Sequence, residues 1–248
     1  MLKLKNIDVS FNNNHILQKL SCNVEQGDFI VIVGANGAGK STFFNTIAGK
    51  IMPNQGSIHL DGIDITNLNE QQRSGMITRL FQNTKLNSVG SLTVAQNLAM
   101  AHYSRRSARL VDGMKDMPRN QLEEIVGELG VDASILNKQM QTLSGGQRQL
   151  ISFVMATRLI PKILLLDEPT AALDPKASTR LLQYATQFIK KHRVTTLLIT
   201  HDPHIALSIG NKIWVLENGI ITKEYSHEEK VGLTPDMLIG QIDYANLC

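Results

Sequence analysis

The 248-residue chain lacks most of what disulfide scaffolds, zinc sites and membrane spans require. Its two cysteines, Cys22 and Cys248, form no Cys-x-x-Cys pair, which argues against a disulfide framework and against a structural zinc site. This cysteine usage indicates a reducing compartment. No uninterrupted apolar stretch reaches the length of a membrane span, and we expect no secretory leader at the start of the chain.

An excess of one charge is also missing. The 25 Lys and Arg residues against 22 Asp and Glu leave a formal net charge of +3, a balance that argues against nucleic acid as the main ligand. The hydrophobic fraction of 42% and the charged fraction of 19% are ordinary for a globular protein. The length fits one large domain, or a domain with a subdomain, and no internal repeat or low-complexity linker is visible.

The most informative stretch is residues 29–42, FIVIVGANGAGKST. Its first five residues form an apolar run typical of a buried parallel strand, and the residues after Thr42 open a predicted helix. Between them lies a match to G-x-x-x-x-G-K-[ST]. We call residues 34–42 the phosphate loop; they are Gly34, Ala35, Asn36, Gly37, Ala38, Gly39, Lys40, Ser41 and Thr42.

The residue types of the phosphate loop suit phosphate chemistry. Glycines allow consecutive backbone N–H groups to curl around phosphate oxygens. A helix N-terminus adds unpaired donors and the positive end of a dipole. Lys40 can reach the β- and γ-phosphates, and Ser41 can ligate Mg²⁺. The alternative is a flexible glycine-rich turn with an exposed lysine.

Two acids end a second apolar run, Ile163 to Leu166. Asp167 and Glu168 therefore follow a central parallel strand at its carboxyl end, where open α/β sheets bind ligands. Asp167 can hold Mg²⁺, directly or through water, and Glu168 can act as general base on a water molecule. His201 follows another buried run at the same predicted edge, although a lone histidine there is more often structural.

A second helix with an N-terminus suited to anion binding begins at Ser144, a good N-cap followed by two glycines. It ends a segment, residues 84–161, in which helical spacing replaces strand runs. We interpret this segment as a helical subdomain inserted between two halves of a nucleotide-binding core. Within it, the basic stretch 103–118 is either a solvated loop or a contact surface for a partner.

Three further patterns concern the ends of the chain. Leu2, Leu4, Ile7 and Val9 have the spacing of an edge strand with one buried face. Phe11 follows and can stack on a purine, or it is a core or turn aromatic. Near the other end, the Asn-Gly pair at residues 218–219 predicts a β-hairpin.

Taken in order, these motifs resemble the ATPase subunit of an ABC transporter over nearly the full length. The Walker A motif is the phosphate loop, and Gln82 marks the glutamine loop. Residues 143–147, LSGGQ, match the family signature, and we call them the signature segment. Walker B ends at Asp167, Ala171 to Asp174 match the D-loop with Ala where the family often has Ser, and His201 matches the switch histidine.

The resemblance implies ATP and Mg²⁺ as ligands and assigns a role to each matching residue. Lys40, Glu168 and His201 would be catalytic, and Phe11 would stack on adenine, where the family often has Tyr. Ser41, Gln82 and Asp167 would hold the metal. Nucleotide contacts would come from residues 34–42 and from Phe11, Gln82, Ser144, Gly146, Gln147 and Asp174, with the signature segment and Asp174 acting across a dimer.

The resemblance also implies a fold and partners. The fold would be α/β, a phosphate-loop NTPase core with a mixed or parallel sheet, an N-terminal antiparallel β subdomain and an inserted helical subdomain. Residues 1–83 and 159–248 would form the core with its β subdomain, and residues 84–158 the helical part. The partners would be a second copy or a paired ATPase subunit, an integral-membrane permease and an extracytoplasmic substrate-binding protein, with no nucleic acid.

Details of the sequence favour one branch of the family. Segments such as DGIDIT, FQNTKLN and SLTVAQNLA are most similar to importer ATPases near the branched-chain amino acid group. We therefore expect the chain at the cytoplasmic face of the inner membrane, docked on a separate permease. The alternative is an ABC ATPase that regulates or assembles proteins, in cell division or iron–sulfur assembly. Neighbouring permease and binding-protein genes would favour transport.

Overall fold

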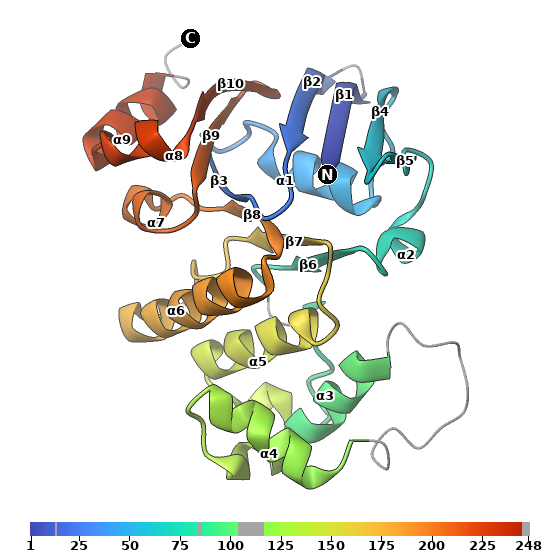
Figure 1. The fold of residues 1–248 in the computed structure, drawn as a ribbon, viewed down its shortest axis with the longest axis vertical. Coiled ribbons are helices and arrows are strands. Elements are labelled where there is room, and N and C mark those ends of the chain that lie inside the picture. Colours follow the sequence, from blue (N-terminus) through green and yellow to red (C-terminus); the bar gives the residue numbers. More distant parts are fainter. Residues whose placement is uncertain (13, 84–85, 104–116, 245–248) are drawn as a thin grey trace. The chain divides into compact units, whose positions relative to one another are not determined.

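The computed structural model describes residues 1–12, 14–83, 86–103 and 117–244 (Figure 1). The chain forms two compact units. Unit 1 comprises residues 1–79, 161–168 and 189–248, and unit 2 comprises residues 80–160 and 169–188. Unit 1 therefore takes its strands from both ends of the chain, whereas unit 2 comes from the middle.

The first sheet of unit 1 is antiparallel, with its strands in the order β2-β1-β4-β5. They are β1 (Leu2–Phe11), β2 (Asn14–Val24), β4 (Gln55–Leu60) and β5 (Ile63–Asp64). In β1 the apolar residues Leu2 and Leu4 are buried, while Lys3 and Lys5 between and after them are exposed. This period-two alternation is the pattern on which the strand was predicted. β1 pairs with β2 on one side and with β4 on the other, so the prediction that it is an edge strand is wrong. The antiparallel β subdomain is confirmed.

The second sheet has the strand order β10-β9-β3-β8-β7-β6. Its strands are β3 (Phe29–Val33), β6 (Ile77–Leu80), β7 (Ile163–Asp167), β8 (Thr195–Ile199), β9 (Lys212–Glu217) and β10 (Ile220–Tyr225). β3 runs parallel to both β8 and β9, and β10 is antiparallel to β9. Every residue of β3 is buried, as expected for a central parallel strand. The predicted mixed sheet is confirmed.

A single hydrophobic core includes side chains from both sheets and from helix α1 (Lys40–Ala48). α1, drawn in light blue next to the N-terminal strands in Figure 1, contributes Phe43, Phe44 and Ile47, all fully buried. Complete burial of such side chains stabilises the fold by about 1.5–3 kcal/mol each. The helix that follows the phosphate loop is therefore firmly anchored.

The carboxyl end of α1 is capped by a buried arginine. Arg73 ends the short helix α2 (Glu70–Arg73), is fully buried, and donates hydrogen bonds of 2.8 Å to the carbonyl oxygens of Thr46 and Ile47. It also donates to the carbonyls of Ile65 and Thr66. Burial lowers the pKa of Arg73 to about 10, so it stays cationic near neutral pH and complements the helix dipole.

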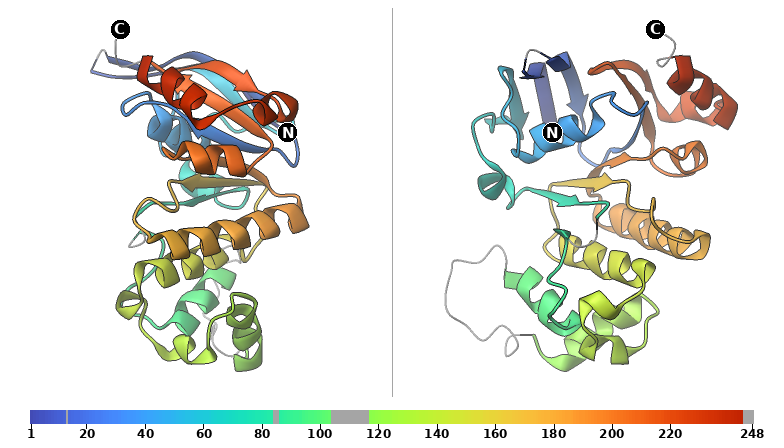
Figure 2. Two further views of the ribbon diagram at one scale, coloured as in Figure 1. Left: turned by 90° about the vertical axis from the view of Figure 1, so that its left-hand side faces the viewer. Right: turned by 180° about the vertical axis from the view of Figure 1, so that it is seen from behind.

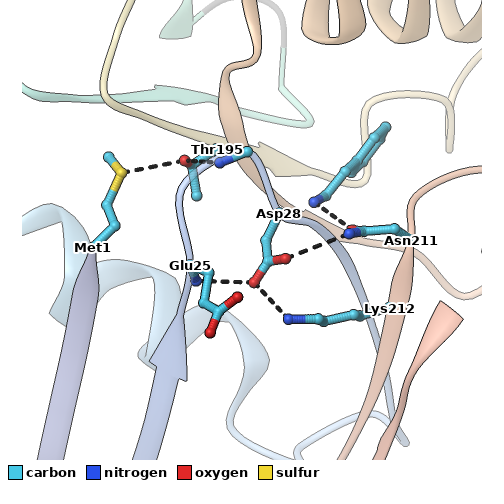
Figure 3. A network of polar contacts seen from close by, with 8 residues as sticks. Met1, Glu25, Asp28, Thr195, Asn211 and Lys212 are labelled. Atoms are coloured by element: carbon cyan, nitrogen blue, oxygen red, sulfur yellow. Dashed lines mark hydrogen bonds and ion pairs between the residues drawn. The ribbon is translucent and has the colours of Figure 1, made fainter.

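The amino end of β3 is fixed by a polar network around Asp28 (Figure 3). The buried Asp28 carboxylate accepts hydrogen bonds of 2.9 Å from Lys212 Nζ and from the Glu25 backbone N–H. Asn211 accepts from the Phe29 N–H at 2.7 Å. Because Asn211 precedes β9 and Lys212 begins it, the network joins two neighbouring strands (Figure 3). It supports their register at the edge of the sheet opposite the carboxyl end of β7.

The last part of unit 1 begins with the predicted hairpin. Asn218 and Gly219 both have positive φ, 46° and 78°, as a type I′ turn requires. Figure 2 shows the hairpin, in orange and red, beside the N-terminal strands in blue. Helices α7 (Pro203–Ser208), α8 (His227–Val231) and α9 (Pro235–Tyr244) complete the unit.

Unit 2 is mainly helical. It contains α3 (Val94–Tyr103), α4 (Arg119–Glu128), the 3₁₀ turns η2 (Ala133–Asn137) and η3 (Met140–Thr142), α5 (Gly145–Thr157) and most of α6 (Pro175–His192). α5 packs against α6 through Phe153, whose ring lies edge-on to Tyr184 and Phe188 with centroids 5.9 Å apart in each pair. Such edge-to-face pairs contribute about 0.5–1.5 kcal/mol beyond burial. A helical subdomain is present, as expected, whereas its predicted bounds, residues 84–158, stay a prediction; unit 2 also takes residues 169–188.

α2 and β6 are among the elements absent from the sequence-based prediction, because the polar pattern of residues 71–79 hides them. Most of the basic stretch 103–118 lies outside the described residues, so neither interpretation of it is tested. Among the described helices, none is long and apolar enough to cross a bilayer.

Candidate nucleotide-binding site

The phosphate loop joins the carboxyl end of β3 to the N-terminus of α1, as predicted. Gly37 and Gly39 adopt positive φ values of 84° and 99°, which curl the backbone. Gly39 is the N-cap of α1, and no side chain caps this helix end. Ser41 is exposed in the first turn. The first amides of α1 are thus available to an anion, and the helix dipole favours one there.

The wall behind the phosphate loop is built by distant segments. The Gly219 N–H donates a 3.0 Å hydrogen bond to the Ala38 carbonyl, and the Gln18 N–H donates one of 3.1 Å to the Gly219 carbonyl. A Cβ on Gly219 would lie 2.1 Å from the Ile16 carbonyl oxygen, and a Cβ on Gly34 would lie 2.2 Å from that of Leu216. Glycine is therefore required at both positions. The hairpin was predicted, but its contact with the loop was not.

Lys40 is turned into the loop. Its side chain donates hydrogen bonds to the carbonyl oxygens of Gly34 and Ala35, at 2.7 and 2.8 Å, and the residue is 6% exposed. Burial lowers the pKa of Lys40, whereas the carboxylates of Glu168 and Asp167 act in the opposite direction. The sequence-predicted cation thus lies within electrostatic reach of both acids.

Asp167 ends β7, and Glu168 follows it at the carboxyl edge of the sheet. Glu168 has a left-handed backbone with φ of 47°, which is uncommon for a residue with a side chain. Its N–H donates a 3.0 Å hydrogen bond to the Ile199 carbonyl of β8, which supports this conformation. Its carboxylate Oε1 lies 2.6 Å from Nε2 of His201. Strained backbone of this kind is often found at functional sites.

Sequence reasoning missed one residue of this cluster. Arg79 of β6 forms an ion pair with Asp167, and its other terminal nitrogen donates to Asn45 Oδ1 at 2.5 Å. The only signal in the sequence was a charged residue next to the hydrophobic Leu80 and Phe81, and it was too weak to interpret.

The donor set of unit 1 fits a hard divalent cation. Ser41 offers a hydroxyl oxygen and Asp167 a carboxylate, the ligand types that Mg²⁺ prefers, with waters and substrate phosphates completing its shell. Among the described residues, no group of three or more His, Cys, Asp and Glu side chains is arranged to hold a metal without a substrate. Gln82, the third predicted metal ligand, belongs to unit 2 and is exposed.

Phe11 ends β1, opposite Asn14 of β2. Its side chain is 47% exposed, so much of its ring surface is accessible. This exposure disfavours the interpretation of Phe11 as a core aromatic and leaves a ring available for stacking.

In unit 2 the signature segment opens α5 with a capping box. The Ser144 hydroxyl accepts from the Gln147 N–H at 3.3 Å, and Gln147 Oε1 accepts from the Ser144 N–H at 3.2 Å. The N-cap predicted at Ser144 is confirmed. Ser144 and Gln147 are both exposed, so this helix end is accessible from solvent.

Two other predicted site residues of unit 2 have local structural partners. A Cβ on Gly146 would lie 2.6 Å from the Cβ of Ala177, so glycine permits the close approach of α5 and α6. Asp174 Oδ1 accepts a 2.9 Å hydrogen bond from the Ala177 N–H at the start of α6. Both residues therefore have a packing or capping role in the isolated chain, which does not depend on nucleotide.

Comparison with known proteins identifies the family. Residues 17–171 match the ABC transporter family. The chain is 37% identical over 251 residues to the tyrosine transport ATP-binding protein of Clostridioides difficile (strain R20291), covering 99% of this chain and all of that protein. It is 32% identical over 243 residues to the thiamine import ATP-binding protein ThiQ of Escherichia coli (strain K12), covering 97% and 95%.

Solved structures agree. The fold is similar to a nucleotide-free ATP-binding cassette from an ABC transporter, with a TM-score of 0.83 and 25% identity over 99% of this chain and 98% of that one. It is also similar to the cassette MJ0796 in a dimeric post-hydrolysis state bound to ADP and Pi, with a TM-score of 0.77 and 27% identity over 92% and 99%. With the phosphate loop, the acids of β7 and the signature segment in family order, the chain belongs to the ABC transporter family, as an ATP-binding subunit that hydrolyses ATP in coupling to transport.

Proposed function

We propose that this chain drives import of a small solute by ATP-controlled closure of two ATPase subunits beneath a separate permease. The arrangement of Lys40, Glu168 and His201 carries the proposal, because it combines a phosphate-binding cation with an acid able to activate water. Similarity over nearly the full length to a transport ATP-binding protein and to an import ATP-binding protein supports the assignment to uptake.

ATP binding begins at the phosphate loop. The backbone amides of residues 34–42 and the Lys40 ammonium bind the phosphates, and Phe11 stacks on the adenine. Because Lys40 now donates to the carbonyls of Gly34 and Ala35, binding requires its ammonium to redirect these donors to phosphate oxygens.

Mg²⁺ accompanies the nucleotide. Ser41 and Gln82 would ligate the ion, and Asp167 would hold it through water. When bound, the metal neutralises the charge that develops on the phosphate oxygens. The oxygen-only donor set supports this assignment.

Hydrolysis requires a proton acceptor for the attacking water. Glu168 accepts that proton while the water oxygen bonds to the γ-phosphorus and the bond to the ADP oxygen breaks. His201, 2.6 Å from the Glu168 carboxylate, orients it and contacts the γ-phosphate. The left-handed backbone of Glu168 fixes the direction of its Cα–Cβ bond, so the carboxylate needs little reorganisation during the reaction.

The signature segment acts on nucleotide held by another subunit. Its exposed Ser144, with Gly146 and Gln147, contacts the γ-phosphate of that ATP, and Asp174 transmits the state of one site to the other. The partner is a second copy or a paired ATPase subunit. The dimeric state of the similar cassette MJ0796 supports this assembly.

The rest of the system consists of other chains. The coupling helix of the permease docks beside Gln82, along residues 84–106, and holds the chain at the cytoplasmic face of the membrane. Residues 84–158 act as the helical subdomain that carries the signature segment. The remaining residues, 1–83 and 159–248, act as the nucleotide-binding core. A substrate-binding protein outside the membrane delivers the solute.

An amino acid is the solute class best supported. Relatives named for tyrosine transport and methionine import fit this class, and one named for thiamine import does not. The finer assignment to the branched-chain amino acid group rests only on the sequence segments that suggested it, and it stays a prediction.

Co-purification and uptake test the proposal together. A tagged full-length chain is isolated from detergent-solubilised membranes, and its permease partner is identified by mass spectrometry. The complex, reconstituted with the binding protein in vesicles containing ATP, is offered tyrosine, methionine, leucine and thiamine separately. It should accumulate at least one of the three amino acids. The Lys40→Ala complex serves as the inactive control.

Recovery of the chain only from cytosol, without a membrane partner, would contradict the transport function and favour the regulatory or assembly alternative. Accumulation of thiamine alone would contradict the amino-acid class while leaving the transport function intact.

A further inference from the structure

Arg79 links the two halves of the candidate site in unit 1. One of its terminal nitrogens forms an ion pair with Asp167 at the end of β7. The other donates a 2.5 Å hydrogen bond to Asn45 on α1, the helix that starts at Lys40. The guanidinium also lies 5.9 Å from the ring centre of Phe44 on the same helix.

This ion pair is largely withdrawn from water. The side chains of Arg79 and Asp167 are 8% and 14% exposed, in contrast to the ion pair of Lys162 and Asp61, at 49% and 39%. Ion pairs on the surface contribute little, whereas a charge left alone in a buried site is strongly unfavourable. The geometry of Asp167 therefore depends on its ion pair with Arg79.

Arg79 and Mg²⁺ compete for the same acid. A carboxylate in a fixed, charge-assisted hydrogen bond has less electron density and less freedom to offer a metal or its water shell. Lys40 and Arg79 together also balance the charges of Asp167 and Glu168, so two cations face two anions.

We propose that Arg79 is a positioning residue that holds Asp167 until Mg·ATP arrives, and so limits metal binding to the nucleotide-loaded state. Asn45 and Phe44 fix the guanidinium on the helix of the phosphate loop. Contacts made by the phosphates at the start of α1 can thereby weaken the hold on Asp167. This inference rests on the proposed role of Asp167 in holding Mg²⁺.

The test measures the Mg²⁺ concentration that gives half-maximal binding of a fluorescent ATP analogue to the full-length chain. Arg79→Met removes the charge but keeps a long side chain. We expect it to lower the half-maximal Mg²⁺ concentration about tenfold, the effect of losing one charge-assisted hydrogen bond. Binding of Mn²⁺ without nucleotide, followed by electron paramagnetic resonance, should become detectable.

Two further variants keep the test decisive if Arg79→Met folds poorly. Arg79→Lys retains the charge and should stay within about twofold of the wild type. Asn45→Ala leaves Arg79 in place but removes its anchor on α1, and it should shift the Mg²⁺ dependence in the same direction as Arg79→Met, by less. Lys162→Met, which breaks the exposed pair at the other end of β7, is the matched control and should change nothing.

An unchanged Mg²⁺ dependence in both Arg79→Met and Asn45→Ala would overturn the inference and leave Arg79 as a structural ion pair. Asp167→Asn distinguishes this from failure of the proposed function. If Asp167→Asn does not weaken the Mg²⁺ dependence either, the metal role of Asp167 is wrong, and the inference falls with it.

Discussion

The two helix N-termini predicted to meet phosphate differ in how the chain satisfies them. At α1 the first turn carries no side-chain cap, and the buried Lys40 lies beside the acids of β7. At α5 the exposed Ser144 closes a capping box with Gln147. Arg148, in the first turn of α5, donates to the carbonyls of Met140 and Leu143.

This difference indicates that the two helix N-termini contribute differently to nucleotide binding. The N-terminus of α1 is an anion site within one chain, with Lys40 as its cation and Glu168 as the proposed general base. The end of α5 offers only backbone dipoles and a hydroxyl, which is too little to bind a nucleotide alone. Its contribution has to be made to a nucleotide already held elsewhere, which agrees with the proposed assembly.

The largest expected effect is at the α1 site. Glu168→Gln removes the proton acceptor but keeps the shape of the side chain, so hydrolysis should fall by a factor of about 10²–10⁴. ATP binding should persist, and gel filtration with ATP should show a stable dimer. Near-normal turnover in this variant would refute the role of Glu168 and make the two helix ends more alike than we propose.

The wall of the phosphate loop gives the next largest effect. Gly219→Ala forces a Cβ into the Ile16 carbonyl, so we expect the free energy of unfolding to fall by roughly 3 kcal/mol, with weaker ATP binding. Gly62→Ala is a matched control, since Gly62 has a φ of 81° and open space around it. The control should lose only about 1 kcal/mol, the cost of the left-handed backbone. Urea denaturation measures the free energy of unfolding of both variants. Equal losses in Gly219→Ala and Gly62→Ala would show that the structure relieves the clash at residue 219.

The third largest effect is expected when the Lys40 ammonium is removed. Lys40→Ala should weaken ATP binding by roughly 10- to 100-fold, since a hydrogen bond to a charged group contributes about 1.5–3 kcal/mol. Lys50→Ala, an exposed lysine just beyond α1, should leave the affinity unchanged in isothermal titration. Similar losses in both variants would indicate a general charge effect in place of a specific contact.

The smallest effect on stability belongs to α5. Ser144→Ala should lower the free energy of unfolding by about 1 kcal/mol through loss of the cap. Ser226→Ala removes the equivalent capping box of α8 and should cost about the same. Only Ser144→Ala should abolish the ATP-dependent dimer in the Glu168→Gln background. A dimer that survives it would contradict the role of the signature segment.

Local patterns predicted the elements that carry these groups. The apolar runs before Gly34 and Asp167 gave the strands, and the Asn-Gly pair gave the hairpin, because each pattern specifies its own backbone. The cap at Ser144 was predictable for the same reason. The roles of the site residues came from the motifs and from the family resemblance, and they stay proposals.

Contacts between distant segments were not predictable from local patterns. The ion pair of Arg79 with Asp167 joins residues 88 positions apart. Gly219 contacts the phosphate loop across a separation about twice as long, and Arg73 caps α1 from a helix hidden in a polar stretch. In each case the side chain has ordinary neighbours in sequence, and only the folded topology shows what it faces.

The strand order of the second sheet has a consequence for how the protein is made. β3 is synthesised early, yet its two neighbours are residues 195–199 and 212–217. Pairing across such a span has to wait for most of translation. We expect ribosome-stalled chains that end before residue 212 to be cleaved by protease within residues 29–42, and chains extending past residue 225 to resist. Residues 29–42, which contain the phosphate loop, are thus synthesised early but become functional only late in translation.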